Sequence, residues 1–468
     1  MSEEIYYAPA TELAARIRRK ELSPVEVVQT HLDRIAQLNS TLNAIVFFAG
    51  DPMEQARQAE AAVIRGDDLG PLHGVPYTLK DCIETSGMRM SLGSKIYDGY
   101  ISQQDAEVYT RLRSAGGILL GKTNMPEFAL WWETDNDVFG VTRNPWNLER
   151  TAGGSSGGEV AAIAAGLSPF GLGTDLGGSI RAPASLCGVV GIKPTLGRIP
   201  YTGIQPQTIL RAIHVGPIAR TVGDVALGMS ILAGADDVDL YTPPVPVPDY
   251  ASLDVDLSGL KVGWSPTAGV PVEPEVQRSV AEAAAALGEL GVNVEPVEIP
   301  ALVDNNASAI STVIFTMEAR RYSAPTIAGR ESELTALFRS RFVDGSTFTM
   351  DDYLNATDEW EKLRVAVKEY FTHYDIFLCP TVPMPAFPHG HNEFHIDGRD
   401  LAGRHTLRLT LPWDLTGSPA ISVPFGFSAE GLPIGVQVVG RHFDELKLLQ
   451  VARKLEARMS QTRRPPVG

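Results

Sequence analysis

The stretch GGSSGGEVAAIAA at Gly153–Ala165 joins a glycine-serine loop directly to an apolar, alanine-rich segment. Alanine is the best helix former, so we expect a buried helix to begin near Glu159. A second glycine-rich run, GLGTDLGGSIR, follows at Gly171–Arg181. Glycine adopts backbone conformations that other residues avoid, so N–H groups of this run can converge on one point, as an oxyanion hole requires. A tight turn is the alternative. Each run carries a candidate serine, Ser155 or Ser179.

Three other interpretations of the first loop are weaker. A phosphate-binding loop ends in Gly-Lys-Ser/Thr, whereas Glu159 would repel a phosphate here. The loop matches Gly-x-Ser-x-Gly twice, centred on Ser155 and on Ser156, but the nucleophile elbow of α/β-hydrolases needs a strand directly before it. We expect no strand in the preceding residues Asn144–Arg150. A flexible linker is poorly supported as well, because an apolar helix follows the loop at once.

Lys80 is the third candidate for chemistry. It ends the apolar segment GVPYTLK, Gly74–Lys80, which predicts a short buried strand. A buried lysine loses charge because desolvation disfavours the ammonium form, and the neutral amine can then act as a general base. Serine-lysine arrangements are an accepted variant of nucleophilic catalysis. The alternative is an exposed surface charge, which is the usual state of a lysine.

The composition is typical of a globular protein with a sizeable core. Of 468 residues, 44% are hydrophobic and 21% are charged, and the formal net charge is -16. Basic groups such as Arg16–Lys20 are short, so we expect no nucleic-acid partner. We find no signal peptide and no apolar run of about 18 residues, and we expect a cytoplasmic protein without a membrane partner. The scattered cysteines Cys82, Cys187 and Cys379 fit a reducing compartment.

Predicted strands alternate with predicted helices over most of the chain, which indicates an α/β fold with helices covering a sheet. Proline-rich residues Asp236–Ser258 are the best linker candidate, but the alternation resumes after them, so a long surface loop is favoured over a domain boundary. The expected helices are Ala10–Lys20, Pro24–Leu38, Ala106–Ala115, Glu159–Ala165, Ala219–Gly234, Glu273–Leu290 and Glu445–Arg458, and the expected strands are Gly74–Lys80, Ile118–Leu120, Leu260–Trp264, Val292–Ile299, Ile421–Pro424 and Ile434–Val439.

Histidines offer a competing hypothesis, a structural metal site formed by His389, His391, His395 and His405. Gly390 and nearby prolines predict a loop here, not a helix that presents ligands at i and i+4. The motif His-Glu-x-x-His is absent. Loop histidines are more often solvated, so we expect no metal.

The two serine loops and Lys80 together resemble the amidase signature family of serine hydrolases. The core motif of that family is similar to Gly153–Gly158 through Gly177–Arg181, and the spacings from Lys80 to both serines agree. The resemblance covers about residues 10–458. It implies a single domain over residues 1–468, an α/β fold with a mixed central β-sheet covered by helices on both faces, and no cofactor. Further matching segments are Gly74–Pro76, Gly121–Phe128, Gly188–Thr195, Thr416–Ala420 and Gly431–Gly435.

By this resemblance, Ser179 is the nucleophile of an acyl-enzyme mechanism, Ser155 relays the proton, and Lys80 is the base. The resemblance also implies a cis peptide bond between Gly154 and Ser155. The other implied site residues are the oxyanion-hole N–H groups of Leu176, Gly177 and Gly178, besides that of Ser179, and residues that hold the loops, namely Ser156, Thr174, Asp175 and Arg181.

Two insert-like regions, Phe128–Phe139 and Pro200–Ile213, are expected to shape the substrate pocket. Within them we predict substrate contacts from Ala129, Trp131 and Ile209; packing under loops is the alternative. The resemblance implies hydrolysis of linear amides or anilides, and in some members carbamates (urethanes). We favour a stand-alone amidase, monomeric or homodimeric, for small apolar or aryl amides, with carbamates and esters as further substrates.

The alternative is an amidotransferase A-type subunit, which acts on aminoacyl-tRNA within a multi-subunit complex. That branch of the family carries Ser-Leu-Asp-Gln-Ile-Gly-Pro after the Lys-Pro-Thr motif. This chain has RAIHVGP at Arg211–Pro217, without the Asp. The departure and the acidic composition favour the stand-alone enzyme.

Overall fold

Alternating strands and helices build one eleven-stranded sheet with the strand order β1-β3-β2-β6-β8-β7-β14-β15-β11-β9-β10. The computed structural model describes residues 2–303, 306–345, 347–459 and 463–467. The strands of this sheet are β1 (Ile45–Phe48), β2 (Pro76–Lys80), β3 (Ile118–Thr123), β6 (Phe170–Asp175), β7 (Val190–Lys193), β8 (His214–Ala219), β9 (Lys261–Trp264), β10 (Asn293–Pro296), β11 (Ile376–Pro380), β14 (Ala420–Phe427) and β15 (Pro433–Gly440).

The sheet is mixed. β2 pairs in parallel with β3 and with β6, and β9 pairs in parallel with β10 and with β11. The strands from β6 through β8, β7, β14 and β15 to β11 pair antiparallel. β9, β10 and β11 follow the proline-rich residues 236–258 and still join the same sheet as β1, β2, β3, β6, β7 and β8. That segment therefore connects two parts of one sheet.

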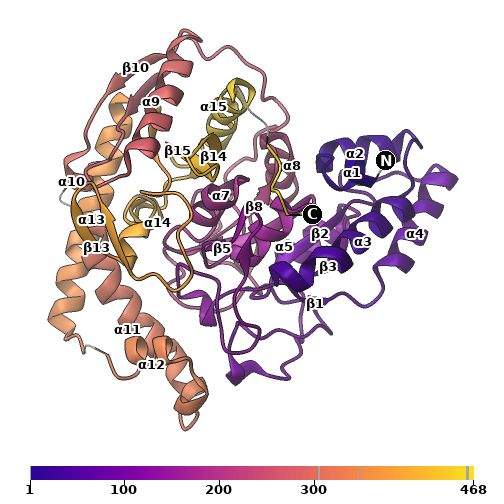
Figure 1. Cartoon of the computed structure of the whole chain (residues 1–468), viewed down its shortest axis with the longest axis horizontal. Coiled ribbons are helices and arrows are strands. Elements are labelled where there is room, and N and C mark those ends of the chain that lie inside the picture. Colours follow the sequence, from indigo (N-terminus) through magenta and orange to yellow (C-terminus); the bar gives the residue numbers. More distant parts are fainter. Residues whose placement is uncertain (1, 304–305, 346, 460–462, 468) are drawn as a thin grey trace.

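Helices cover both faces of the sheet (Figure 1). One hydrophobic cluster joins α5, α8, α9 and α15 to the strands, and another joins α3, α6 and α7. The helices α11, α12 and α13 lie on the side of the molecule opposite the N-terminal helices (Figure 1). The helices are α1 (Ser2–Tyr6), α2 (Ala10–Arg18), α3 (Pro24–Leu42), α4 (Pro52–Arg65), α5 (Glu107–Ser114), α6 (Gly157–Ala164), α7 (Arg181–Cys187), α8 (Val222–Leu232), α9 (Pro274–Gly288), α10 (Pro300–Val303), α11 (Ala307–Ile327), α12 (Ala336–Phe342), α13 (Met350–His373), α14 (Leu411–Thr416) and α15 (Glu445–Arg458).

Every predicted helix and strand is present, with ends shifted by a few residues. The start of α3 shows the local cause. Ser23 Oγ accepts a hydrogen bond from the Val25 N–H at 2.9 Å, and Pro24 occupies the first turn, where its missing N–H costs nothing.

Two local expectations are wrong. Residues Asn147–Thr151 do form a strand, β5, which pairs with β4 (Arg143–Asn144) in a separate two-stranded sheet. This strand lies outside the central sheet, so the loop after it is still no nucleophile elbow. The first part of the second glycine run, Gly171–Asp175, belongs to β6 and not to a loop. Only residues 176–180 of that run connect β6 to α7.

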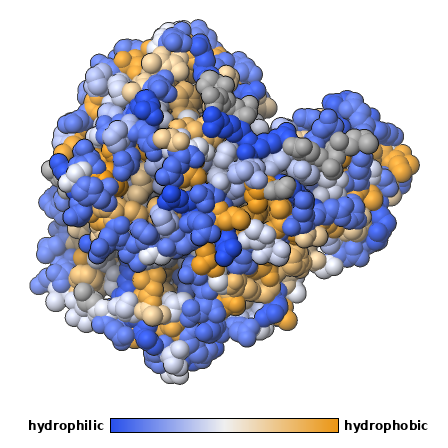
Figure 2. Space-filling view, viewed as in Figure 1, coloured by the Kyte–Doolittle hydropathy of each residue, from blue (hydrophilic) through white to orange (hydrophobic). Residues whose placement is uncertain are grey.

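Hydrophilic side chains cover most of the face in Figure 2, with smaller apolar groups between them. Among the exposed apolar side chains are Val238 and Leu240, in the connection 236–258. Within the described ranges, no helix is both long enough and apolar enough to span a bilayer.

Candidate active site

The site lies at the carboxyl ends of two neighbouring parallel strands. β2 and β6 pair with Thr78 opposite Gly171 and Leu79 opposite Leu172. Parallel neighbours end at the same edge of a sheet, where sites of α/β proteins commonly form. Lys80 at the end of β2 therefore comes beside the end of β6.

Lys80 is fully buried, as predicted. Its Nζ lies 2.6 Å from Ser155 Oγ and 2.8 Å from Thr174 Oγ1. Both partners are hydroxyl groups, which compensate an ammonium charge less than a carboxylate does. Burial lowers the pKa of Lys80 to about 8, against the attraction of nearby acidic groups. With that pKa, roughly one molecule in ten holds a neutral amine at pH 7.

The first glycine-serine loop turns directly into α6, and its Gly154–Ser155 peptide bond is cis, as predicted. Gly154 is required by space. A Cβ at this position would lie 2.8 Å from the backbone nitrogen of Glu133 and 2.9 Å from the carbonyl oxygen of Trp131. The loop is therefore packed against the segment that contains Trp131.

Ser156 joins the first loop to the second. Its N–H donates to the carbonyl of Ser179 at 3.1 Å, and its Oγ donates to the carbonyl of Thr174 at 3.3 Å. Ser155 and Ser179, the predicted relay and nucleophile, are thus carried by two loops that are hydrogen-bonded to each other. The hydroxyl of Ser155 is directed to Lys80.

Glu159, in the first turn of α6, reaches back to β2 and β3. Its carboxyl group accepts hydrogen bonds from Thr78 Oγ1 and, at 2.8 Å, from Thr123 Oγ1. Burial raises the pKa of Glu159 to about 8. The carboxyl is therefore mostly protonated at neutral pH, so α6 is anchored near Lys80 without a full negative charge.

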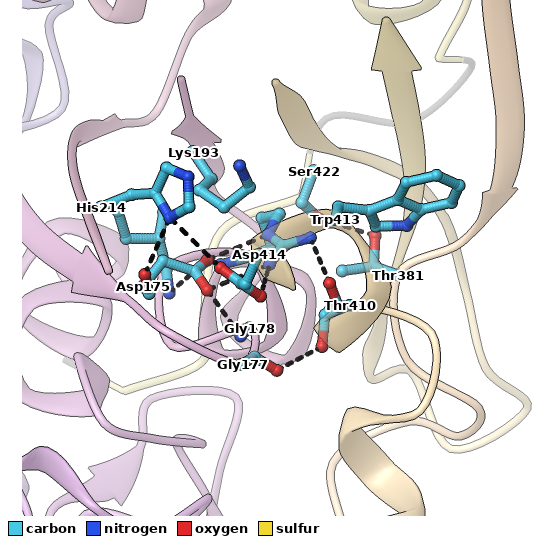
Figure 3. A network of polar contacts seen from close by, with 12 residues as sticks. Asp175, Gly177, Gly178, Lys193, His214, Thr381, Thr410, Trp413, Asp414 and Ser422 are labelled. Atoms are coloured by element: carbon cyan, nitrogen blue, oxygen red, sulfur yellow. Dashed lines mark hydrogen bonds and ion pairs between the residues drawn. The ribbon is translucent and has the colours of Figure 1, made fainter. Parts of the chain in front are cut away.

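The second loop is built around Asp175, the last residue of β6 (Figure 3). Its Oδ1 accepts a hydrogen bond from the Gly178 N–H at 2.5 Å, and its Oδ2 accepts one from the Ile180 N–H at 3.1 Å. Arg181 donates to both oxygens, Nε to Oδ2 at 2.9 Å and Nη2 to Oδ1 at 3.0 Å. One carboxylate thus holds the turn from its inner side.

The N–H group of Gly178 does not point to the oxyanion hole in which we predicted it. Because it donates to Asp175, it is not available to a substrate oxygen, and Gly178 is removed from the candidate donors. Leu176, Gly177 and Ser179 are partly exposed. Among the residues that the structure describes, their N–H groups have no hydrogen-bond acceptor. These three N–H groups are the remaining candidates for the oxyanion hole.

Thr410 holds the Gly177–Gly178 peptide from the opposite side. Its Oγ1 donates to the Gly177 carbonyl at 2.6 Å, and its own carbonyl accepts from Arg181 Nη1 at 2.9 Å (Figure 3). Gly178 has a φ of 123°, which favours glycine, and a Cβ there would collide with the Thr410 side chain. The peptide plane is therefore fixed at its C=O by Thr410 and at its N–H by Asp175.

Arg181 is fully buried and completes its contacts with Asp414 Oδ2 at 2.7 Å and Gln437 Oε1 at 2.8 Å. Burial disfavours its charge, but Asp175 and Asp414 outweigh this effect and raise the pKa of Arg181. Burial likewise disfavours the Asp175 carboxylate, but Arg181 holds the pKa of Asp175 well below its usual range. Arg181 and Asp175 therefore stay charged. Lys193 lies beside the same cluster (Figure 3), and burial lowers its pKa to about 7.

A cavity of about 80 Å³ opens in front of Ser179. Ala129 and Trp131, two of the predicted substrate contacts, line it, and Trp131 stacks on Trp132 with ring centroids 3.5 Å apart. The full lining is Ala129, Leu130, Trp131, Trp132, Leu176, Gly177, Ser179, Ser308, Ser311, Thr312, Phe315, Arg341, Phe342, Arg404, Leu407 and Leu411.

Ile209, the third predicted substrate contact, is not part of this lining. Its side chain is 3% exposed and packs in a hydrophobic cluster with Leu411. Other residues of Pro200–Ile213, including Tyr201 and Leu210, line a separate cavity of about 10 Å³. The alternative, packing under loops, applies to this second insert-like region.

The histidines of the C-terminal half contact separate groups. His389 contacts the Leu148 carbonyl at 3.3 Å, and His395 contacts Asp400 at 2.9 Å. His405 contacts the Pro271 carbonyl. In the described part of the chain, no three histidine, cysteine or acidic side chains are grouped closely enough to hold a metal ion.

Sequence reasoning missed the residues that the C-terminal half contributes. Thr410 contacts the nucleophile loop, Asp414 contacts Arg181 directly after that loop, and Arg341 and Arg404 line the cavity. One signal was available for the first pair. They lie directly before Thr416–Ala420, a segment that already resembled the family. No sequence pattern singled out either arginine.

The chain is similar to proteins of known sequence and structure over almost its whole length. The family model described as Amidase matches residues 26–449. The chain is 38% identical over 487 residues to the A-type subunit of the glutamyl-tRNA(Gln) amidotransferase of Moorella thermoacetica, covering 99% of each chain. It is 36% identical over 468 residues to an acylamidase of Rhodococcus erythropolis, covering 97% of this chain and 96% of that protein.

Among solved structures, a bacterial aryl acylamidase described as an amidase signature enzyme superposes with a TM-score of 0.90 at 28% identity. The match covers 97% of both chains. An acylamidase and an amidotransferase subunit thus resemble this chain to a similar degree in sequence. The comparisons do not separate the two activities.

Proposed function

Because the chain belongs to the amidase signature family, we propose that it is a stand-alone amidase that hydrolyses carboxamide bonds of small apolar or aryl substrates. The observation that carries the proposal is the 2.6 Å contact between Lys80 Nζ and Ser155 Oγ in a fully buried position. Burial lowers the pKa of Lys80 to about 8, so a usable fraction of the amine is neutral near physiological pH.

In the proposed mechanism, Ser179 Oγ attacks the carbonyl carbon of the bound amide. Its proton passes to Ser155 Oγ while the Ser155 proton passes to the neutral amine of Lys80. The carbonyl oxygen becomes an oxyanion that accepts hydrogen bonds from the N–H groups of Leu176, Gly177 and Ser179. Losing one such donor typically costs ~10²- to 10³-fold in rate.

The C–N bond then breaks as the same relay returns the proton from the Lys80 ammonium to the leaving nitrogen. The product amine departs and Ser179 is left as an ester with the acyl group. Water attacks this ester, the relay takes a proton from the water, and the proton returns to Ser179 Oγ as the acid is released. Atoms balance as one amide and one water giving one acid and one amine.

The preference for apolar or aryl substrates rests on the cavity wall. Trp131, Phe315 and Phe342 present aromatic rings beside Ser179, and Leu176 and Leu411 add aliphatic surface. Aromatic walls of this kind favour flat or apolar groups. A carbamate or ester offers the same carbonyl to Ser179, so both belong to the substrate panel.

The test uses the purified chain alone on four chromogenic substrates: an anilide, a carbamate, an ester and a primary amide. We expect turnover of at least the anilide, and loss of this turnover in Ser179→Ala by about 10⁴-fold or more. Wild type should be labelled at Ser179 by a sulfonyl fluoride, and Ser179→Ala should not be. A label mapped to another residue would contradict the assignment of the nucleophile.

An amidotransferase A-type subunit is the second candidate, favoured by the identity to the Moorella thermoacetica protein. Against it stands Ile213, at the position where that branch carries Asp in the Ser-Leu-Asp-Gln-Ile-Gly-Pro stretch. Affinity purification of the tagged chain from its own cells separates the two candidates. Stoichiometric partner chains, together with no turnover by the isolated chain, would support the second candidate.

A further inference from the structure

We propose that the cavity in front of Ser179 binds its substrate through a carboxylate, held by Arg341 and Arg404. The inference rests on the proposed function and specifies its substrate: an amide whose apolar or aryl body carries a carboxylate at the end remote from the scissile bond. Both arginines line the cavity that also contains Ser179. They come from different parts of the chain, Arg341 from α12 and Arg404 from the turn before α14.

Arg341 has no acidic ion-pair partner among the residues that the structure describes. Among the described residues, no side chain or carbonyl accepts a hydrogen bond from its guanidinium, which instead lies 5.5 Å from the ring centroid of Phe342. Burial and the nearby charge of Arg404 both lower the pKa of Arg341. A partly buried guanidinium that faces another cation is poorly compensated, and an incoming carboxylate would compensate it with paired hydrogen bonds.

The acidic residues that line a neighbouring cavity with Arg341 form no ion pair with it among the described residues. Asp137 and Glu127 line an adjacent cavity with Arg341. Asp137 pairs with Lys95 at 3.7 Å, and Glu127 accepts hydrogen bonds from Ser94 Oγ and from Thr335. Asp135 lines the same adjacent cavity, and burial raises the pKa of its carboxyl group. None of these carboxylates forms an ion pair with Arg341 within the described residues.

Arg404 is the more exposed partner. Its Nη1 lies 3.4 Å from Thr312 Oγ1, a hydroxyl on α11 that also lines the cavity. Within the described ranges this weak contact is the hydrogen bond that Arg404 makes, so most of the five N–H groups of its guanidinium have no acceptor there. The arrangement suits a carboxylate that enters from solvent and meets Arg404 first.

The two arginines in this cavity contrast with the acidic composition of the chain. The formal net charge is -16, so the protein as a whole repels anions at long range. An anionic substrate therefore needs a local positive site. The same cavity is lined mostly by aromatic and aliphatic side chains, so we expect an apolar spacer between the carboxylate and the scissile carbonyl.

The test compares matched pairs of p-nitroanilides that differ only in charge. Glutaryl p-nitroanilide carries a carboxylate where 5-methylhexanoyl p-nitroanilide carries an isopropyl group of the same shape. Succinyl and adipoyl pairs vary the spacer, and a further pair of anilides places the carboxylate or the isopropyl group on the leaving aniline. For at least one pair we expect kcat/KM to favour the carboxylate by about tenfold or more, the usual size of a charge-assisted hydrogen bond.

In Arg341→Met this preference should fall toward one, mainly through a higher KM for the carboxylate substrate. Arg341→Lys should keep part of the preference. The matched control is Arg339→Met, on the same helix, whose side chain lies 3.9 Å from Asp344 and does not line the cavity. It should leave the preference unchanged. A wild type that favours no carboxylate in any pair, or an Arg341→Met variant with the full preference, overturns the inference.

The two proposals fail separately. Cleavage of the neutral anilides that depends on Ser179 supports the amidase whatever the charge preference. If wild type cleaves neither member of any pair, the amidase proposal fails, and binding still decides the inference. Calorimetric titration of glutaryl p-nitroanilide into Ser179→Ala should then give a Kd at least about tenfold lower than into Ser179→Ala/Arg341→Met. Equal Kd values overturn it.

Discussion

Lys80, the last residue of β2, and Arg181, the first residue of α7, are both fully buried, yet their surroundings differ completely. Lys80 meets two hydroxyl groups, from Ser155 and Thr174. Arg181 meets two carboxylates, an amide oxygen and a carbonyl. Burial lowers the pKa of Lys80 to about 8, whereas the carboxylates raise the pKa of Arg181. The partners, and not burial alone, decide which cation can release its proton.

Because of this difference, the two cations have different roles in the site. A cation that can become neutral can act as a general base, because its neutral form can take a proton from a serine. A cation that stays charged stabilises the structure, because it compensates the Asp175 carboxylate that holds the nucleophile loop. Lys193 is a third case. Burial lowers its pKa to about 7, but its amine donates to the Pro194 carbonyl at 3.2 Å and, among the described residues, to no hydroxyl group. We therefore do not expect Lys193 to act as the base, because a lowered pKa alone does not connect its amine to a serine hydroxyl.

Lys80→Met should have the largest effect on rate. Methionine fills most of the same space but cannot accept a proton, so we expect kcat/KM at pH 7 to fall by about 10²- to 10⁴-fold. The thermal midpoint should change little, because the lost hydrogen bonds are offset by the removal of a buried amine. Anilide hydrolysis and a circular dichroism melt measure the two quantities. A variant with a near-wild-type rate would exclude Lys80 as the base.

Arg181→Met should show the opposite pattern, with stability as the main loss. It leaves the Asp175 carboxylate buried without its cation, which typically costs about 3–5 kcal/mol. Urea unfolding of wild type and variant measures the change in the free energy of unfolding. Arg181→Lys restores the charge but not the fork of donors, so its loss should be intermediate. A change below about 1 kcal/mol would remove the distinction between the two cations.

The contrast also explains which site residues could be predicted from the sequence. Lys80, Ser155 and Ser179 were predictable because each belongs to a short local pattern, an apolar strand or a glycine loop. Thr410 and Asp414 were not, because they reach Gly177 and Arg181 from more than 200 positions away. Which N–H group of the second loop faces the cavity depends on Asp175 and Thr410 together. The sequence therefore predicted Gly178 as an oxyanion donor, which its bond to Asp175 excludes.

Strand β6 was misread for a similar reason. Glycine is uncommon in strands, so GLGTD read as a loop. In the fold, Gly173 faces Ser156, where a Cβ would lie 2.6 Å from Ser156 Oγ, and Gly171 faces the carboxyl group of Glu159. The glycines let α6 approach the sheet closely. The strand can be recognised only once its neighbours are known.

Thr410→Val should have a moderate effect on the rate. It tests whether the residues around Arg181 affect catalysis by fixing the nucleophile loop. The substitution keeps shape but removes the 2.6 Å hydrogen bond to the Gly177 carbonyl. A less fixed peptide should lower kcat by about tenfold with little change in KM, because the oxyanion is bound only after attack. Steady-state kinetics on the anilide separates the two constants.

Thr406→Val is the matched control for that variant. Thr406 precedes Thr410 on the same segment and is buried, and within the described residues its hydroxyl has no hydrogen-bond partner. Removing this hydroxyl should leave kcat and KM unchanged. Equal losses in both variants would mean that the segment responds to any substitution, and that the Thr410 hydroxyl has no special role in orienting the loop.

Lys193→Met should have the smallest effect on the rate. The pH dependence of kcat/KM tests this prediction. Catalysis needs neutral Lys80, so kcat/KM of wild type should rise about tenfold per pH unit below pH 8 and level off above it. The pKa of Lys193 is lowered to about 7, so a limb near pH 7 would report that residue instead. In Lys193→Met we expect the same limb near pH 8 and the same plateau as in wild type. A limb that moves or disappears in this variant would mean that proton transfer extends into the Arg181 cluster, and that the two buried cations do not act separately.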